Sequence, residues 1–420
     1  MVNNLAHHLE RVASLLHANG QTTQRLIADT TRLARAWRID WQILPQWDGI
    51  VCRWRDAQSD NQDWHTQVLP VRPVGLEMHK VASTNGFIER VCNDPDRLDP
   101  DHIKAAGDTL EQIEHYKPSS HARFVSMAGL GAAGLGVIFG VTDPLVLSLI
   151  FLTAALGAAV RRMLVNVSDN LLVQPFVAAL IAGLAGGLAQ HAFSDPRVQF
   201  IVIAPCMILV PGAHILNGSL DLLRGRLGLG VSRMAYVCLI LLAICVGLLA
   251  GLGLSGASLS EAALSVHTPW WLDTLAAGVA VAAFGAFFSL PWHLLAAPVL
   301  VGMACHGSRW LILESGGGVV TATLVACMIA GSIMTVLSRT LKLPFAALAF
   351  ASVVSMMPGI FIFKFAAALV DIYSAGVNAT LVMLLAAVSN GTGALMIVLA
   401  MTFGLIVPKM FIENIFYRNT

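Results

Sequence analysis

The chain has 420 residues, of which 56% are hydrophobic and only 12% are charged, and its mean hydropathy is +0.71. A water-soluble globular or disordered protein does not carry that much apolar surface, so the composition indicates a polytopic membrane protein. The formal net charge of +1 provides no basic excess that could hold phosphates, which disfavours a nucleic-acid-binding protein.

Charged residues are concentrated at the start of the chain. Residues 1–121 hold 13 of the 26 Lys and Arg and 16 of the 25 Asp and Glu. This distribution predicts a water-exposed domain over residues 1–121, followed by a membrane region. We expect this domain to stay in the cytoplasm, because Glu10 and Arg11 interrupt the first apolar stretch and no signal peptide is recognisable.

The hydrophobic periodicity of residues 1–121 predicts a small α+β domain. The predicted helices span residues 5–16, 26–37, 77–91 and 99–115. The predicted antiparallel strands span residues 41–44, 50–54 and 67–69. The histidines of this domain and the seven cysteines of the chain lack the spacing of a zinc site, so we expect no metal and no cofactor. Its tryptophans are expected to fill a small core or an interface.

Ten apolar segments follow, each close to the roughly 20 residues that a helix needs to cross a bilayer. They lie near residues 124–141, 144–160, 171–190, 198–215, 234–254, 270–289, 291–307, 318–337, 344–363 and 378–407. The predicted fold class is therefore an all-α polytopic membrane protein with about ten transmembrane helices and a small N-terminal α+β cytoplasmic domain.

The two sets of five segments share the same pattern of proline, glycine and arginine. In each set, the second segment runs from a proline to an arginine and the fourth carries a Pro-Gly pair. These features are Pro144 to Arg161-Arg162, Pro291 to Arg309, Pro211-Gly212 and Pro358-Gly359. We expect two five-helix repeats, residues 122–256 and 257–420, in opposite orientations because five is an odd number.

The positions of Lys and Arg provide a check on this orientation. With the N-terminus inside, ten would lie in cytoplasmic segments and three outside. The ten are Arg123, Arg161, Arg162, Arg224, Arg226, Arg233, Arg339, Lys342, Lys409 and Arg418, and the three are Arg197, Arg309 and Lys364. This excess satisfies the positive-inside rule and predicts that both termini are cytoplasmic.

Interrupted helices in an inverted repeat expose backbone groups that can bind a polar solute near the middle of the membrane. Proline and glycine weaken a helix, and polar groups near these breaks or along the last segment could contact the solute. The expected substrate-binding residues are Pro205, Pro211, Gly212, Asn217, Pro358, Gly359, Asn390 and Thr392. The alternatives are that Pro-Gly only ends a helix at the membrane surface and that the polar groups hold helices together.

Two pairs of charged residues follow the Pro-Gly motifs, and charges within a membrane usually face a cavity or a partner. Asp221 and Arg224 are three residues apart and share a helix face, whereas Lys364 and Asp371 are separated by two turns. Either pair could exchange partners as the site opens, and Asp371 is the expected proton carrier. Alternatively, Asp221 and Arg224 form a surface pair of about 0.5 kcal/mol or less.

The segments Leu15-Leu16-His17-Ala18-Asn19-Gly20, Pro205 to Pro211-Gly212, and Met357-Pro358-Gly359, in this order and architecture, resemble the threonine/serine exporter family in its fused single-chain form. The resemblance covers almost the whole chain. It implies proton-driven export of small hydroxy amino acids, threonine and serine, across the inner membrane of a bacterium. The implied partners are the amino acid, protons and membrane lipid, without nucleic acid, and a homo-oligomer is left open.

Two other function classes compete with a transporter. An intramembrane hydrolase or lipid-modifying enzyme would need a nucleophile beside a base, and Ser289 with His293 or Cys305 with His306 are the local pairings. A membrane scaffold or regulator would act through its soluble domain. We expect no enzyme activity and no nucleotide, because the phosphate-binding motif G-x-x-x-x-G-K-[ST] is absent.

Overall fold

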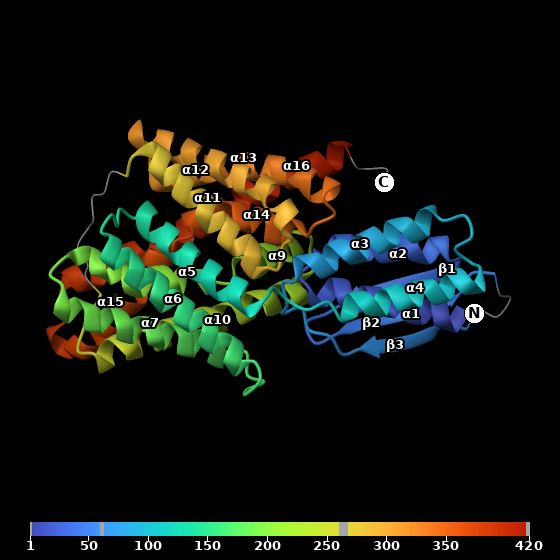
Figure 1. The fold of residues 1–420 in the computed structure, drawn as a ribbon, viewed down its shortest axis with the longest axis horizontal. Helices are drawn as coiled ribbons and strands as arrows, with labels where there is room; N and C mark the ends of the chain where they lie inside the picture. The colour runs from blue at the N-terminus through green and yellow to red at the C-terminus, as the bar shows by residue number, and fades with distance from the viewer. Residues whose placement is uncertain (1, 59–62, 260–267, 417–420) are drawn as a thin grey trace.

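The computed structural model describes residues 2–58, 63–259 and 268–416. Figure 1 shows two parts side by side along the long axis, a small mixed domain formed by the start of the chain and a larger helical bundle. Arg418, one of the predicted cytoplasmic cations, lies outside the described residues.

The first part is the α+β domain that the periodicity predicted. Its elements are α1 (Val2–Ala18), α2 (Thr23–Ala36), β1 (Ile39–Pro45), β2 (Ile50–Asp56), β3 (His65–Leu69), α3 (Met78–Asn93) and α4 (Pro100–Glu114). The three strands pair antiparallel in the order β1-β2-β3. Two local signals account for the helix ends: Gly20 adopts a φ of +86° at the turn after α1, and the Asp99 carboxylate accepts from the Asp101 backbone N–H at the start of α4.

The apolar faces of these elements enclose a separate small core. Leu9, Leu33 and Leu110 are fully buried in it, and Trp37 and Trp54 are buried beside them. The prediction that tryptophans fill this core is confirmed for these two residues. Because the core belongs to the domain itself, the domain presents a defined surface to the bundle.

Predominantly apolar helices build the second part. They are α5 (His121–Ile138), α6 (Pro144–Leu164), α7 (Val173–Ala192), η1 (Pro196–Gln199), α8 (Phe200–Ile208), α9 (Gly212–Leu223), α10 (Leu227–Leu254), α11 (Trp270–Phe287), η2 (Trp292–Leu294), α12 (Ala296–Glu314), α13 (Val319–Thr340), α14 (Phe345–Val353), η3 (Val354–Met356), α15 (Gly359–Ala375), η4 (Gly376–Asn378) and α16 (Leu381–Phe416). In the described residues, nine helices are long and apolar enough to cross a membrane, or ten if α8 and α9 are one bent span. The predicted polytopic membrane fold is confirmed.

The fourth and ninth predicted segments are interrupted rather than continuous. We call Leu209–Pro211, between α8 and α9, the first break, and Met357–Pro358, between η3 and α15, the second break. The chain bends by 48° at the first break. Proline has no backbone N–H to continue the helix, so a new helix starts after each one. Gly212, Pro358 and Gly359 are buried, so these Pro-Gly pairs do not lie at the protein surface.

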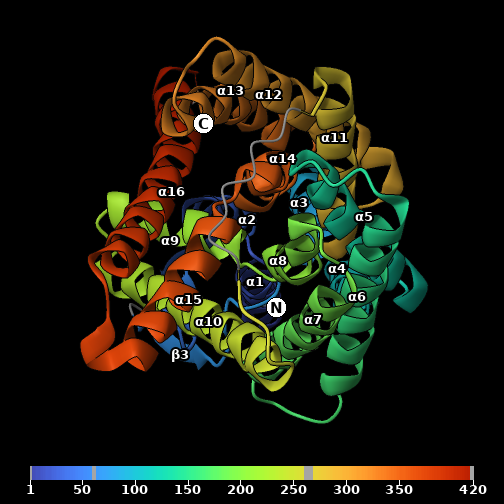
Figure 2. The same ribbon diagram turned by 90° about the vertical axis from the view of Figure 1, so that its left-hand side faces the viewer.

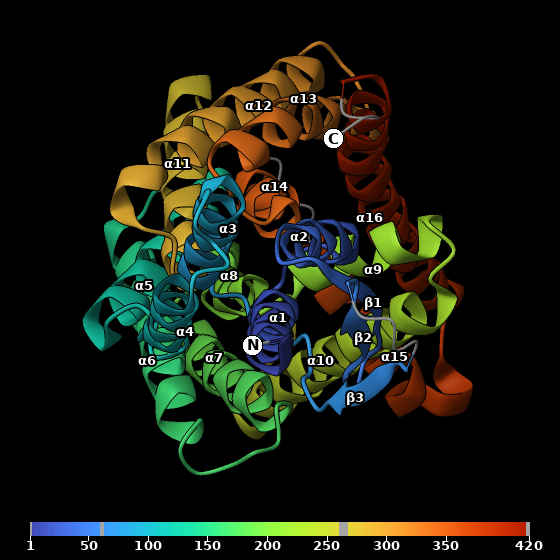
Figure 3. The same cartoon turned by 90° about the vertical axis from the view of Figure 1, so that its right-hand side faces the viewer.

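Close helix pairs surround the broken helices. Viewed along the bundle, α8 and α14 lie inside a ring of longer helices (Figure 2). In this ring, α7 packs against α10 and α13 against α16. Both pairs depend on glycine, because a Cβ on Gly183 would lie 2.3 Å from the Leu248 carbonyl oxygen and one on Gly331 2.7 Å from the Leu405 carbonyl oxygen. From the opposite end, α1 and α2 of the small domain lie over the middle of the ring (Figure 3).

Candidate functional site

The two breaks meet in the centre of the bundle, each against the other half of the chain. A Cβ on Gly212 would lie 1.8 Å from Cε2 of Phe350 on α14, and one on Gly359 would lie 2.5 Å from Cγ of Met207 on α8. Gly212 and Met357 also line one small apolar pocket. The absence of side chains at both glycines therefore lets the two interrupted helices touch.

A cavity of about 500 Å³ lies against the first break, and we call it the break cavity. The first break and Gly212 form one wall, and the linker 74–77 of the small domain forms another. Polar side chains reach it from α6, α7, α9 and α10: Arg161, Arg162, Gln174, His214 and Tyr236. A small pocket beside it includes Pro205 and shares Arg161 with it.

Arg161 is the outstanding polar group of the break cavity. Its guanidinium carbon lies 5.1 Å from the centre of the Phe287 ring. Its Nε and Nη1 are buried and have no hydrogen-bond partner among the described residues. Buried N–H groups without an acceptor are costly, so Arg161 is suited to bind an anionic group that enters the cavity.

The broken helix adds two further charges to the same wall. The carbonyl end of α8 carries a partial negative charge, and the N–H end of α9 carries a partial positive charge. Both ends border the break cavity, at Ile208 and Gly212. A small zwitterion could place its carboxylate near Arg161 and the start of α9, and its ammonium near the end of α8.

The small domain docks on α9 beside this wall. The Asn217 side-chain amide donates to the Gly20 carbonyl oxygen at 3.2 Å, and the Thr23 hydroxyl donates to Oδ2 of Asp221 at 3.0 Å. The Trp47 ring also lies 5.0 Å from that of Tyr236, which lines the break cavity. Asn217, an expected substrate-binding residue, thus contacts the turn between α1 and α2.

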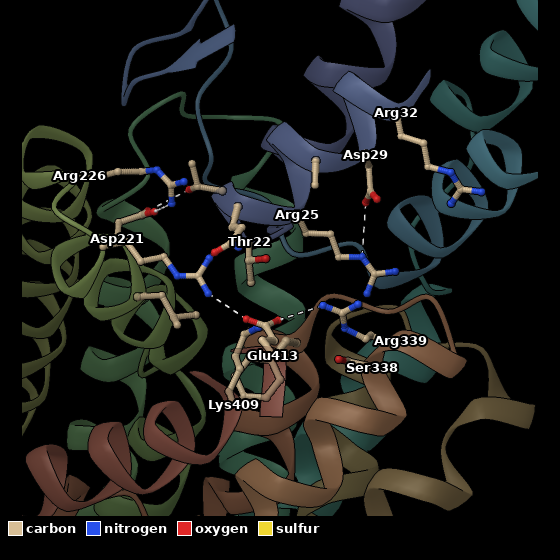
Figure 4. Close-up of a pocket in the computed structure, with 16 residues that line it drawn as sticks. Thr22, Arg25, Asp29, Arg32, Asp221, Arg226, Ser338, Arg339, Lys409 and Glu413 are labelled. Carbon is tan, nitrogen blue, oxygen red and sulfur yellow. Dashed lines mark hydrogen bonds and ion pairs between the residues drawn. The ribbon is translucent and has the colours of Figure 1, made fainter. Parts of the chain in front are cut away.

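A second cavity, of about 270 Å³, separates α2 from the ends of α9, α13, α14 and α16, and we call it the charged cavity (Figure 4). Glu413 lies at its floor and makes three ion pairs: with Arg224 at 2.9 Å, with Arg339 at 3.6 Å and with Lys409. Because Arg224 and Glu413 belong to different halves of the chain, this network joins the two halves.

The expected couple of Asp221 with Arg224 is corrected by these contacts. Asp221 lies 3.5 Å from Arg226 and 3.4 Å from Arg233, whereas Arg224 turns to Glu413. Asp221 is 2% exposed, so the alternative of an exposed surface pair does not apply to it. The spacing in the sequence could not show a glutamate almost 200 residues away.

The face of the charged cavity formed by α2 carries Arg25, Asp29 and Arg32. Burial raises the pKa of Asp29 above its ordinary value, and the charge of Arg25, 3.4 Å away, partly opposes this effect. Six Lys or Arg and three Asp or Glu line the cavity. This excess of cations makes it attractive to anions.

The remaining expected residues lie away from both cavities. Asp371 is exposed near the end of α15, 12 residues beyond Gly359, which corresponds to roughly 18 Å along a helix. Lys364 is half-buried on the same helix. The Thr392 side chain is exposed and donates to the Val388 carbonyl oxygen of its own helix, and the Asn390 amide donates to that of Ala386. None of these four residues lines the break cavity or the charged cavity.

Sequence reasoning missed two groups that the fold assembles. The sequence analysis interpreted Arg161 only as a positive charge at the end of a membrane segment. His306 was paired with its neighbour Cys305, whereas its ring lies between Asp273 of α11 and Ser355 of η3. Asp273 and His306 were visible as polar residues in apolar segments, which was the available signal. Among the described residues, no group of three or more His, Cys, Asp or Glu is placed to hold a metal.

Comparisons with known proteins agree with the transporter interpretation. A family described as "Putative threonine/serine exporter" matches residues 7–255, and one described as "Threonine/Serine exporter, ThrE" matches residues 273–411. The chain is 22% identical over 406 residues to the "Probable threonine/serine exporter" of Mycobacterium tuberculosis (strain ATCC 25618 / H37Rv), which covers 92% of this chain and 74% of that protein.

A second relative is named "Probable succinate transporter subunit YjjP", from Klebsiella aerogenes, and is 29% identical over 157 residues. That match covers 36% of this chain and 58% of the relative. No solved structure matches the chain. Since the first family match alone spans more than half of the 420 residues, and the second covers most of the rest, the chain belongs to the threonine/serine exporter family.

Proposed function

We propose that this protein is a secondary active exporter of small hydroxy amino acids, threonine and serine, which works by alternating access and is driven by protons. The family and the Mycobacterium tuberculosis relative support the transported class. In this proposal the protein lies in a bacterial inner membrane with both termini in the cytoplasm. The basic residues Arg224, Arg339 and Lys409 support this orientation, because they gather where the bundle meets the small domain.

The proposed movement is a rocking of two inverted repeats, residues 122–256 and 257–420. Matching helix pairs support the repeat: α5 packs on α6 as α11 packs on α12, and α7 on α10 as α13 on α16. The same 147 residues separate Pro144 from Pro291 and Pro211 from Pro358. Each break touches the other repeat, so rocking would change both breaks together.

The solute is proposed to bind in the break cavity, at Pro205, Pro211 and Gly212 of the first repeat. Pro358 and Gly359 are proposed to line the path from the second repeat. The observation that carries this proposal is the buried, unpartnered guanidinium face of Arg161 beside the start of α9. An amino-acid carboxylate supplies the missing acceptor, and Arg favours carboxylates because its planar fork donates two parallel hydrogen bonds.

The same chemistry is compatible with the second relative. Its printed name says succinate, which shares with threonine and serine a carboxylate of the kind that Arg161 would bind. The family model that covers residues 7–255 includes α6 and the first break. Recognition of a carboxylate is thus proposed as the common element of binding in this part of the fold.

Transport by protein reconstituted in lipid vesicles tests this proposal. The measurement is exchange of labelled for unlabelled threonine or serine without an ion gradient, which needs the solute site alone. We expect Arg161→Gln to abolish saturable exchange and Arg161→Lys to weaken solute affinity with less effect on the maximal rate. The matched control is Arg197→Gln, since Arg197 pairs with Asp195 outside both cavities. Wild-type affinity in Arg161→Gln, or no exchange by wild type with either amino acid, would contradict the proposal.

A further inference from the structure

Three buried polar side chains, Asp273, His306 and Ser355, contact one another in a row that leads to the second break. Nε2 of His306 lies 2.9 Å from Oδ2 of Asp273, and its Nδ1 lies 2.9 Å from the hydroxyl oxygen of Ser355. The exposed fractions are 0% for His306, 5% for Asp273 and 3% for Ser355. Ser355 belongs to η3, two residues before Met357, so the chain of contacts ends at the break itself.

Arg309, Cys305 and Cys327 are ionisable groups near these three side chains. Arg309, one turn after His306 on α12, is close enough to interact electrostatically with Asp273 and with Cys327 of α13. Cys305 lies next to His306 in the sequence and is also buried.

Burying an acid and an imidazole among membrane helices costs free energy, so such residues usually serve a function. A carboxylate oxygen and an imidazole nitrogen 2.9 Å apart form a pair that can hold a proton. Ser, His and Asp also form the triads of hydrolases, but that chemistry needs an accessible hydroxyl. The Ser355 hydroxyl is buried and lines neither the break cavity nor the charged cavity, which favours a proton-holding role.

Protonation would change the contact with the break. The contact of Nε2 with Asp273 has the distance of an ion pair but not the geometry of a hydrogen bond. In the neutral ring one nitrogen carries hydrogen and the other accepts, so when the hydrogen is on Nε2, Nδ1 accepts from the Ser355 hydroxyl. A proton from a hydronium ion forms an N–H bond at Nδ1, while one O–H bond of that ion breaks and leaves a water molecule. The ring then donates to Ser355, whose own hydrogen must turn to another acceptor. The hydrogen bond at the second break therefore reverses when the proton binds.

We propose that Asp273 and His306 hold the proton that drives transport, and that Ser355 transmits its presence to the second break. The inference rests on the proposed export function, and it moves the proton carrier from Asp371 to the interior of the second repeat. A proton on this pair would favour one arrangement of the break, so that binding of the proton and of the solute alternate.

The two repeats differ at the positions of these three side chains. The proposed proton site therefore lies in one repeat only, apart from the proposed solute site. At the offset of 147 residues, the positions matching Asp273, His306 and Ser355 are Ser126, Ala159 and Ile208. None of these three side chains titrates in the physiological range. Arg161 thus belongs to the first repeat, whereas the pair of Asp273 and His306 belongs to the second repeat and has no counterpart at the matched positions of the first.

The test compares two transport modes in the same vesicles. Exchange of labelled threonine without a gradient requires solute binding and movement, whereas uptake into vesicles with an acidic interior also requires protons to leave as solute enters. We expect Asp273→Asn and His306→Gln to retain exchange but to lose the stimulation by the pH gradient. Asp371→Asn, which changes an exposed carboxylate in the same repeat, is the matched control and keeps the stimulation.

Several results would overturn the inference. In one, the pH gradient still stimulates uptake by Asp273→Asn. In another, a variant that unfolds at the same temperature as wild type loses both exchange and gradient-driven uptake. If Asp273→Asn does not fold, Asp273→Glu keeps a carboxylate and must restore the stimulation. Ser355→Ala keeps the proton-binding pair and must shift the pH of half-maximal transport. A wild-type protein without exchange would instead contradict the proposed export function, whatever the variants do.

Discussion

Gly212, the first residue of α9, has no room for a side chain. A Cβ there would lie 1.8 Å from Cε2, 2.1 Å from Cζ and 2.4 Å from Cδ2 of Phe350. Carbon atoms in contact are normally about 3.5–4.0 Å apart, so the ring and α9 would have to separate by almost 2 Å. Three close ring atoms mean that a small rotation of the ring cannot relieve the overlap.

We therefore expect Gly212→Ala to destabilise the bundle and to impair transport. Overpacking of this kind typically costs about 1–3 kcal/mol, which exceeds the roughly 0.5–1 kcal/mol that alanine gains over glycine in a helix. The matched control is Gly253→Ala in α10, where a Cβ meets nothing within 4 Å. This variant is expected to be at least as stable as wild type.

Thermal unfolding in detergent and threonine exchange in vesicles measure the two effects. The midpoint temperature of Gly212→Ala should fall below that of Gly253→Ala, and its exchange rate should drop. Adding Phe350→Leu removes the ring that the new methyl group meets, so the double variant should recover part of both losses. Equal midpoints for the two alanine variants, or no recovery in the double variant, would refute the contact between the first break and α14.

Three further predictions concern the small domain and the charged cavity. Glu413→Gln removes the negative charge that faces Arg224, Arg339 and Lys409 and should lower stability by about 1–3 kcal/mol in thermal unfolding, whereas exposed Glu111→Gln should not. Burial lowers the pKa of His17 from 6.5 to about 4, so the wild type should lose stability as the pH falls from 6.5 towards 4 and His17→Gln should flatten that slope. Thr23→Val removes a hydrogen bond to buried Asp221 and should cost about 1–2 kcal/mol, seen as earlier unfolding and easier proteolysis of the domain junction.

The elements of this fold could be predicted from the sequence because they depend on local properties. Segment length and hydrophobicity define the membrane helices, and alternating or helical periodicity defines the α+β domain. Proline decides where a helix stops, so Pro211 and Pro358 indicated both interruptions. The predicted segments nevertheless ended too early, at residues 215 and 363, whereas α9 continues to Leu223 and α15 to Ala375.

The partners of the charged residues could not be predicted, since packing brings them together from distant segments. Spacing suggested Arg224 for Asp221, whereas the tertiary structure gives Arg224 to Glu413 and gives Asp221 to the small domain and Arg233. The same holds for His306, whose contacts arise when α11, α12 and η3 pack together. Local sequence determines helices and their interruptions through backbone chemistry. Buried charges instead pair with the groups that lie nearest in space, and these are set by the packing of the bundle.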